Sequence, residues 1–305
     1  MSASGADSGT TRAAKSAARV LAWSGETLFV LPITAVVGLT IVVPSIAVIG
    51  YSFTNWDPGY HSPWVGLKNY KDLATSADFH QILINQGIFL LGIPLWMILP
   101  LAVAFLLYEG VPFPAVFRTI FFFPAMVSPA LVGILFTFIL LPDGPLNVLL
   151  RNVGLGVLAH SWLADPNLAR PTIIVLLAWA TMGVGVVIFS AALSVLPPEL
   201  LEAASLDGAN WWQRFRHVVL PGIRGTVELW AVILVVTIFL GVFPWIFTLT
   251  RGGPGLLTTT FDFDIYRNAL TFGYFGTAAA ESVYLLLIVG FIILVGVKIF
   301  HREES

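Results

Sequence analysis

Six long apolar segments, separated by short polar connections, follow one another along the chain. A helix needs about 20 predominantly apolar residues to cross the hydrocarbon core of a membrane, and every segment is close to or above that length. The segments lie at about 28–51, 84–108, 116–141, 171–196, 226–250 and 282–300. Polar residues, Pro or Gly bound each of them. The pattern therefore predicts an all-α membrane protein with six transmembrane helices.

The two ends of the chain differ from these segments. Residues 1–27 are rich in Ser, Ala, Gly and Thr, which is typical of a disordered tail. The first apolar segment is longer than the core of a signal peptide, and no small-x-small cleavage pattern follows it, so we expect it to be retained as a span. The predicted organisation is a tail over 1–27, one six-span domain over 28–300 and a short tail over 301–305.

The distribution of Lys and Arg predicts the orientation. Six spans place both termini on one side of the membrane, and cytoplasmic connections are enriched in basic residues. A cytoplasmic N-terminus assigns nine of the fifteen Lys and Arg residues to the inside. The sequence therefore predicts that both termini are cytoplasmic, together with the polar stretch 198–221 between the fourth and fifth spans.

The stretch 198–221 carries the signals of two short helices joined by a turn. Pro198 suits a first helical position, because its missing N–H has no partner there. Gly208 can adopt the left-handed conformation that ends a helix, and Asn210 can cap the next one, which we expect to end at Pro221. The apolar face of that second helix would consist of Trp211, Phe215 and Val218. Two interpretations are open: a connector anchored at the membrane surface, or a docking surface for another protein.

Composition supports the membrane class and limits the chemistry. Hydrophobic residues make up 57% of the 305 and charged residues 10%, against roughly 25% charged in soluble domains, and the mean hydropathy is +0.89. Without cysteine the chain has no disulfide or thiolate chemistry, and a net charge of −2 gives no reason to expect nucleic acid as a partner. The five histidines lack metal-ligand spacing, and neither a phosphate-binding loop nor a serine-nucleophile motif occurs. The sequence gives no basis for an enzyme.

One spaced pattern in the polar stretch is specific enough to indicate a family. It consists of Glu202, Ala203, Ala204 and Gly208, nine further residues, and then Val218, Leu220 and Pro221. This pattern closely resembles the EAA signature of the membrane subunits of ABC importers. Residues 65–70 and 249–254 are similar to external elements of binding-protein-dependent carbohydrate-uptake permeases, of the maltose and glycerol-phosphate type. The resemblance covers most of the chain.

The resemblance implies the type I ABC importer permease fold, with a coupling helix in 198–221, and a division of labour among subunits. The chain would pair with a second, homologous permease in the bacterial cytoplasmic membrane. Two ATPase subunits would bind from the cytoplasm, and an extracytoplasmic binding protein would deliver substrate. ATP and magnesium would be bound by the partner ATPase and no cofactor by this chain, which agrees with the missing phosphate-binding loop. The residues implied to couple to the ATPase are Glu202, Ala203, Ala204, Asp207, Gly208, Leu220 and Pro221.

Candidate residues of the substrate pathway combine aromatic rings with hydroxyl groups. Sugars stack their apolar faces on rings while polar side chains bind their hydroxyls. The candidates are Trp179, Thr181, Phe243, Trp245 and Thr248. Aromatic residues in spans more often serve packing or interfacial anchoring, which is the competing interpretation for each of them. The family often has an acidic residue where this chain has Pro244, so substrate contacts cannot be transferred at that point.

Two carboxylates lie close to span ends. We expect Glu228 and Glu281 to reach water from there, and no span carries a central Asp, Glu or Arg. An ion-coupled carrier would need such a buried residue, and a membrane enzyme would need clustered catalytic groups. A stand-alone secondary carrier or channel for a small polar solute is the alternative hypothesis. Association with an ATPase distinguishes it from the permease subunit of an importer of sugars or sugar-like solutes.

Overall fold

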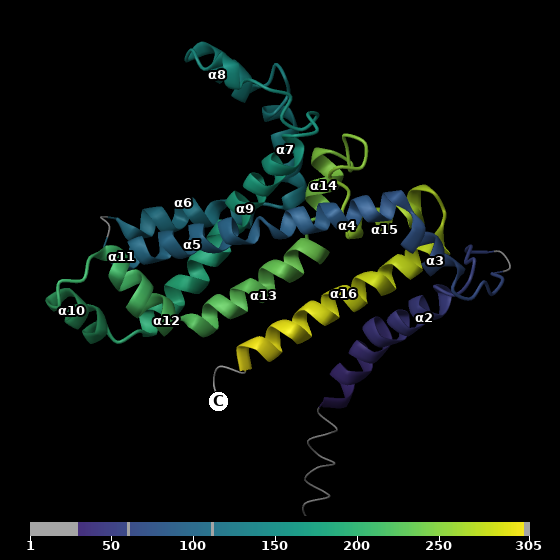
Figure 1. Cartoon of the computed structure of the whole chain (residues 1–305), viewed down its shortest axis with the longest axis horizontal. Helices are drawn as coiled ribbons and strands as arrows, with labels where there is room; N and C mark the ends of the chain where they lie inside the picture. The colour runs from purple at the N-terminus through teal and green to yellow at the C-terminus, as the bar shows by residue number, and fades with distance from the viewer. Residues whose placement is uncertain (1–29, 60–61, 111–112, 302–305) are drawn as a thin grey trace, which may run out of the picture.

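Long helices lie roughly along the long axis of the molecule and form a bundle (Figure 1). The structure, a computed structural model, describes residues 30–301 except 60–61 and 111–112. Within these ranges there is no β-sheet, and one isolated bridge joins Thr54 to Trp64. The predicted tail 1–27 and residues 302–305 lie outside the described residues.

Short connections join the helices. The first described helix covers Val30–Tyr51 and contains a π-turn, η1 (Gly38–Val42), followed by α2 (Val43–Tyr51). The first half continues with α3 (Lys68–Thr75), α4 (Ala77–Leu90), α5 (Ile93–Tyr108), α6 (Pro114–Met126), α7 (Pro129–Ile139), α8 (Pro145–Asn152), η2 (Gly156–Leu158) and α9 (Ala169–Val195). The second half consists of α10 (Pro198–Leu206), α11 (Trp211–Arg214), η3 (Phe215–Val219), α12 (Leu220–Gly222), α13 (Arg224–Leu240), α14 (Phe243–Leu249), α15 (Phe261–Tyr266), η4 (Arg267–Thr271) and α16 (Phe275–His301).

Four of the described helices are long and apolar enough to cross a membrane, and up to six spans result if each of two bent pairs counts as one. The four are Val30–Tyr51, Ala77–Tyr108, Ala169–Val195 and Phe275–Gly296. The second predicted segment, 84–108, lies inside a helix that already begins at Ala77, since the polar residues at the start of α4 are helical too. The prediction of a helical, multi-pass membrane protein is confirmed, while the count of six spans stays a prediction.

Two predicted segments are not straight. In the third, 116–141, α6 and α7 meet at 101°, and Pro129 at the start of α7 lacks the N–H that would continue α6. In the fifth, 226–250, the helix breaks at residues 241–242, just before Pro244. Each of these segments is therefore two helices, because a proline removes the backbone hydrogen bond at the break.

Helix α9 packs against α5 and α6 at the centre of the bundle. At Gly183 a Cβ atom would lie 2.6 Å from the carbonyl oxygen of Phe121, so the backbones of α9 and α6 approach closely only because this residue has no side chain. The indole N–H of Trp96 donates to the carbonyl of Ile174 at 2.8 Å, and that of Trp230 donates to the carbonyl of Trp96 at 3.1 Å. These contacts join α5, α9 and α13 into one core.

Residues 129–168, here called the arm, project from the bundle (Figure 1). The buried Asn147 organises the arm: its Nδ2 donates to the carbonyls of Leu141 and His160 at 2.9 and 2.8 Å, and its Oδ1 accepts from the indole of Trp162 at 2.9 Å. The base of the arm is fixed where α7 packs against α14. All three of these partners of Asn147 lie within the arm, so the arm is held together by its own residues.

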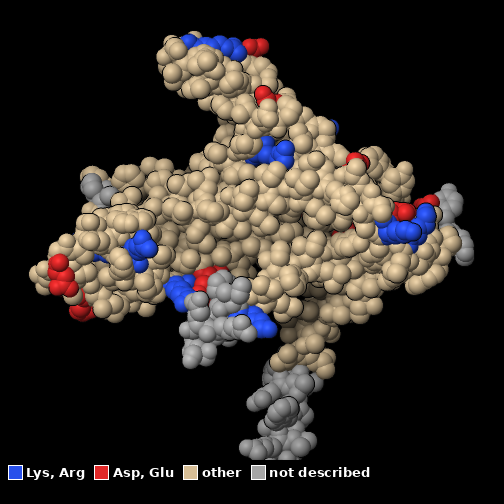
Figure 2. Space-filling model, viewed as in Figure 1, with Lys and Arg blue, Asp and Glu red and all other residues tan. Residues whose placement is uncertain are grey.

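The outer surface of the bundle is mainly apolar. On the face shown in Figure 2, charged side chains gather at the ends of the bundle, along its lower edge and on the arm. None of the apolar window in Val30–Tyr51 is buried within this chain. Such an exterior is what membrane helices present to lipid or to the helices of another subunit.

Candidate functional site

The predicted coupling stretch 198–221 lies at one end of the bundle, opposite α3 and α15 (Figure 1). Its first helix, α10, ends in a turn at Gly208, whose φ of +80° is left-handed. There the N–H of Gly208 donates to the carbonyl of Ser205 at 3.1 Å, and the N–H of Ala209 donates to that of Ala204 at 2.9 Å. These bonds satisfy carbonyls that the end of a helix leaves free. The structure thus has the helix and the glycine turn that the sequence predicts.

The second helix begins with a complete capping box. The side chain of Asn210 accepts from the N–H of Gln213 at 3.0 Å, and the side chain of Gln213 accepts from the N–H of Asn210 at 2.8 Å. The helix runs through the π-turn η3 to one residue beyond Pro221, so the expectation that Pro221 ends it is wrong by that residue. The π-turn adds a residue to the turn and buries Val219, leaving Val218 half-buried.

Two contacts fasten this second helix to the end of α5. The rings of Trp211 and Phe215 stack with their centroids 5.6 Å apart, and Phe105 of α5 packs against them at 5.2 and 5.5 Å. Arg214 Nη2 lies 2.6 Å from Glu109 Oε1, just beyond α5. Both side chains of this ion pair are about three-quarters buried, so water screens it less than a pair on the open surface.

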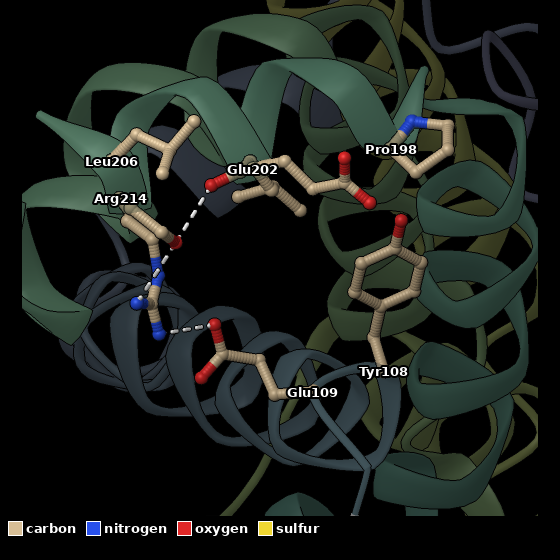
Figure 3. A pocket seen from close by; sticks show the side chains of 8 residues that line it. Tyr108, Glu109, Pro198, Glu202, Leu206 and Arg214 are labelled. Atoms are coloured by element: carbon tan, nitrogen blue, oxygen red, sulfur yellow. Dashed lines mark hydrogen bonds and ion pairs between the residues drawn. The ribbon is translucent and has the colours of Figure 1, made fainter.

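A cavity of about 760 Å³ lies between α10 and the end of α5. Glu202 of α10 lines one side of it, and Tyr108 and Glu109 line the other (Figure 3). The guanidinium of Arg214 also reaches Ser205 Oγ at 3.4 Å, so it bridges the two helices of the stretch. The carboxylate of Glu202 takes no part in the bonds of Arg214 to Glu109 and Ser205, and it borders the cavity.

The seven residues predicted to couple to an ATPase are mostly accessible. Ala204 is half-buried, and the exposed ones are Glu202, Ala203, Asp207, Gly208, Leu220 and Pro221. No group of three or more His, Cys, Asp or Glu side chains that could hold a metal occurs in the part of the chain that the structure describes. Helix α10 is exposed, borders a cavity and is held to the bundle through the next helix, so its surface is suited to contact another protein. The coupling role of these residues remains a prediction.

Two candidates of the substrate pathway lie on α9. Trp179 is 39% exposed and sets its ring edge-on against Phe136 of α7, with the centroids 5.4 Å apart. The hydroxyl of Thr181 donates to the carbonyl of Leu177 in its own helix at 2.8 Å. Part of the Trp179 ring is therefore available to a ligand, and the Thr181 oxygen can still accept a hydrogen bond.

The other three candidates lie on α14. Phe243 is half-buried, with its ring centroid 5.1 Å from that of Tyr266, whereas Trp245 is only 5% exposed and belongs to the core. The hydroxyl of Thr248 donates to the carbonyl of Pro244 at 2.7 Å and lies against Gly133 of α7. Helix α7 therefore contacts both the α9 and the α14 candidates. The burial of Trp245 is what the packing interpretation expects.

Glu281 is fully buried, so the expectation that it reaches water is wrong. Helix α16 begins at Phe275, which places Glu281 in its second turn instead of at its end. Asn268 donates to both Glu281 and Asp264 at 3.1 and 3.0 Å, and Arg267 forms an ion pair with Asp264. The connection before α16 therefore covers a carboxylate that the apolar pattern assigned to a span end.

Sequence reasoning also missed three polar residues that the structure places together. Asn85 and Gln86 of α4 are buried, and Asp262 of α15 is half-buried. Burial raises the pKa of the Asp262 carboxyl above its usual range, while hydrogen bonds from Thr260, Phe243 and Phe263 lower it again in part. The signal that could have revealed them is the Asn-Gln pair inside an apolar segment, because polar groups in spans need partners.

Comparisons with known proteins identify relatives over most of the chain. Residues 97–302 match the family model of the binding-protein-dependent transport system inner membrane component. A probable ABC transporter permease of Pyrococcus horikoshii is 34% identical over 266 residues, which cover 85% of this chain and 90% of that one. A probable permease of the starch degradation products transport system of Thermoanaerobacterium thermosulfurigenes is 28% identical, covering 91% and 94%.

The fold has a solved counterpart as well. In the crystal structure of a bacterial alginate ABC transporter in complex with an alginate pentasaccharide-bound periplasmic protein, one chain superposes with a TM-score of 0.79 at 23% identity, covering 92% of this chain and 95% of that one. At that identity the likeness concerns the fold alone. Together with the match of the family model to two-thirds of the sequence, these findings show that the chain belongs to the binding-protein-dependent inner membrane permeases of ABC transporters, which are transport subunits and not enzymes.

Proposed function

We propose that this chain forms half of the pathway by which an ABC importer takes up a sugar or sugar-like solute. The observation that carries the proposal is family membership together with the exposed helix α10, which borders a cavity, in a sequence that has no ATP-binding motif. The relative from Thermoanaerobacterium thermosulfurigenes described above is a probable permease for starch degradation products. The exposed ring of Trp179 suits such solutes, since sugars stack on aromatic rings.

The remaining parts of the importer follow from this proposal. A second, homologous permease would complete the pathway, and an extracytoplasmic binding protein would deliver the solute. Two ATPase subunits, which hold ATP and magnesium, would dock on α10 from the cytoplasm. This arrangement requires six spans, with α6–α7 as the third and α13–α14 as the fifth, and both termini in the cytoplasm.

Co-purification tests the proposal directly. The tagged chain, expressed with its partner ATPase and second permease and extracted in mild detergent, should retain both of them in stoichiometric amounts. Hydrolysis of ATP by the complex should rise when loaded binding protein is added. A chain that is stable and transports its solute without an ATPase would instead be a secondary carrier.

The ion pair of Arg214 and Glu109 is expected to transmit movement of the coupling element to α5. Arg214→Gln and Glu109→Gln should each lower the amount of solute moved per ATP hydrolysed. A double-mutant cycle of the two substitutions, calculated from the uptake rates, should give a coupling energy of about 1 kcal/mol between the two side chains. The matched control is the surface pair Lys68 and Asp72, which is 3.6 Å apart and largely exposed. Additive effects in the Arg214 and Glu109 cycle would show that the pair transmits nothing.

Trp179 is expected to contact the solute. Trp179→Ala should reduce uptake about fivefold at normal assembly, since a stacked ring contributes on the order of 1 kcal/mol, while Trp179→Phe should keep most of the uptake. The contrasting variant is Trp245→Ala, which empties core volume and should reduce assembly itself. Uptake kinetics per assembled complex separate these outcomes, and unchanged kinetics in Trp179→Ala would remove Trp179 from the pathway.

A further inference from the structure

Two neighbouring polar side chains, Asn85 and Gln86, are buried inside the long apolar helix formed by α4 and α5. Burying an amide without partners costs a few kcal/mol, so buried amides are normally hydrogen-bonded. Both hydrogen-bond partners of the Gln86 side chain, and both partners of the Asn85 amide nitrogen, belong to residues 238–261. These two adjacent residues of the helix thus bind a segment that lies more than 150 residues further along the chain.

Gln86 holds one side of the break between α13 and α14. Its Nε2 donates to the carbonyl of Ile238 at 2.7 Å, and its Oε1 accepts from the N–H of Phe261 at 3.5 Å. In an uninterrupted helix the carbonyl of Ile238 would accept from the N–H of Val242, four residues on. The glutamine therefore supplies the donor that the break removes.

Asp262 holds the other side of the same break. Its Oδ2 accepts from the N–H of Phe243, the first residue of α14, at 2.6 Å. Its Oδ1 accepts from the Thr260 hydroxyl at 2.5 Å and from the N–H of Phe263 at 2.9 Å. Because the N–H of Phe243 would bond to Phe239 in a continuous helix, the carboxylate supplies the acceptor that the break removes.

Asn85 fixes the loop that follows α14. Its Nδ2 donates to the carbonyls of Leu256 and Thr259 at 2.7 and 2.8 Å, and its Oδ1 accepts from Gln81 at 2.9 Å. Inside the loop, the hydroxyls of Thr250 and Thr258 lie 2.7 Å apart. The loop 250–260 is therefore closed on itself and attached to α4.

We propose that Asn85, Gln86 and Asp262 are positioning residues for transport, which keep the α13–α14 break and the loop 250–260 in one rigid body with α4. Movement of α4 and α5 is then passed to the break through these side chains. Broken membrane helices are the places where transporters commonly form their sites, because the backbone groups at the break are available there. The inference rests on the proposed function and adds to it the residues that set the geometry of the pathway.

The test uses the assembled importer in proteoliposomes and two variants that each remove one bond from the break. Asp262→Asn loses the acceptor for Phe243 at nearly constant volume, and Gln86→Leu loses the donor to Ile238. Each should lower the maximal uptake rate per complex about fivefold to tenfold, the rate equivalent of one lost hydrogen bond, while the KM for loaded binding protein stays unchanged. The double variant should be no worse than the poorer single, since both bonds hold the same break. Asp72→Asn, an exposed acid on α3, is the control and should behave as the wild type.

A second readout does not depend on transport. The chain has no cysteine, so Leu240→Cys beside the break can carry a single spin label. Its mobility should rise in Asp262→Asn and Gln86→Leu and stay unchanged in Asp72→Asn. An unchanged maximal rate and an unchanged label mobility in both variants would overturn the inference, and so would loss of assembly in both, which would make the residues purely structural. If the wild-type complex shows no ATP-driven uptake, the proposed function fails, and the label alone then decides whether the break is held.

Discussion

Gly208→Pro is expected to abolish coupled uptake, leaving less than about a tenth of the wild-type rate per complex. The φ of Gly208 is +80°, and the ring of proline fixes this angle near −65°. Proline would also remove the N–H that Gly208 donates to Ser205. The turn between α10 and α11 must then change shape, and α10 would no longer present its exposed face in the same direction. Pull-down with the ATPase and uptake in proteoliposomes measure the two consequences.

The controls separate the shape of the turn from the presence of a side chain. Gly208→Asn should retain about half of the uptake, because asparagine tolerates the left-handed conformation better than other residues and open space surrounds the position. Gly225→Ala, at a glycine with ordinary φ and no near neighbour, should be neutral. Wild-type ATPase binding and substrate-stimulated hydrolysis in Gly208→Pro would contradict a coupling role for this turn.

Gly183→Val is expected to prevent assembly of the permease. A Cβ atom at this position would lie 2.6 Å from the carbonyl oxygen of Phe121 and 2.7 Å from the Cα of Phe122, both of them backbone atoms of α6. Backbone cannot rotate away as a side chain can, so α6 and α9 must separate, at a cost of about 3 kcal/mol or more. Close approach through small residues is a main source of affinity between membrane helices. The amount of intact complex after detergent extraction measures the effect.

The matched control for this variant is Gly290→Val on α16. No atom lies within 4 Å of the Cβ position at Gly290, so the larger side chain meets open space within this chain. The control should assemble normally. Equal assembly of Gly183→Val and Gly290→Val would show that the α6–α9 contact is looser than the structure has it.

The features that the sequence predicts well depend on near neighbours in the chain. Helix α10, the turn at Gly208 and the cap at Asn210 each follow from residues within about one turn of one another. The lengths of the apolar segments likewise predict most of the long helices. Proline positions show where the third and fifth segments are interrupted, but the 101° angle depends on what packs around the break.

The features that the sequence does not reveal depend on distant contacts. Asp262 and Gln86 meet at one break although 175 residues separate Gln86 from Phe261, and no local pattern predicts that meeting. The apolar pattern starts the last segment at 282 and so predicts Glu281 in water, while the chain before it folds back and covers it. Trp245 is the residue type that a sugar-binding site uses, and only the three-dimensional arrangement shows that its side chain is buried.

Uptake by the reconstituted complex tests the central claim most directly. This chain, a second permease and two ATPase subunits would be placed in proteoliposomes that contain ATP and magnesium, with sugar-loaded binding protein outside. Accumulation of the sugar against its gradient is expected, and it should stop when the ATPase subunits cannot hydrolyse ATP. Accumulation at an unchanged rate with inactive ATPase subunits, or by this chain alone, would contradict its assignment as the permease subunit of an ATP-driven importer.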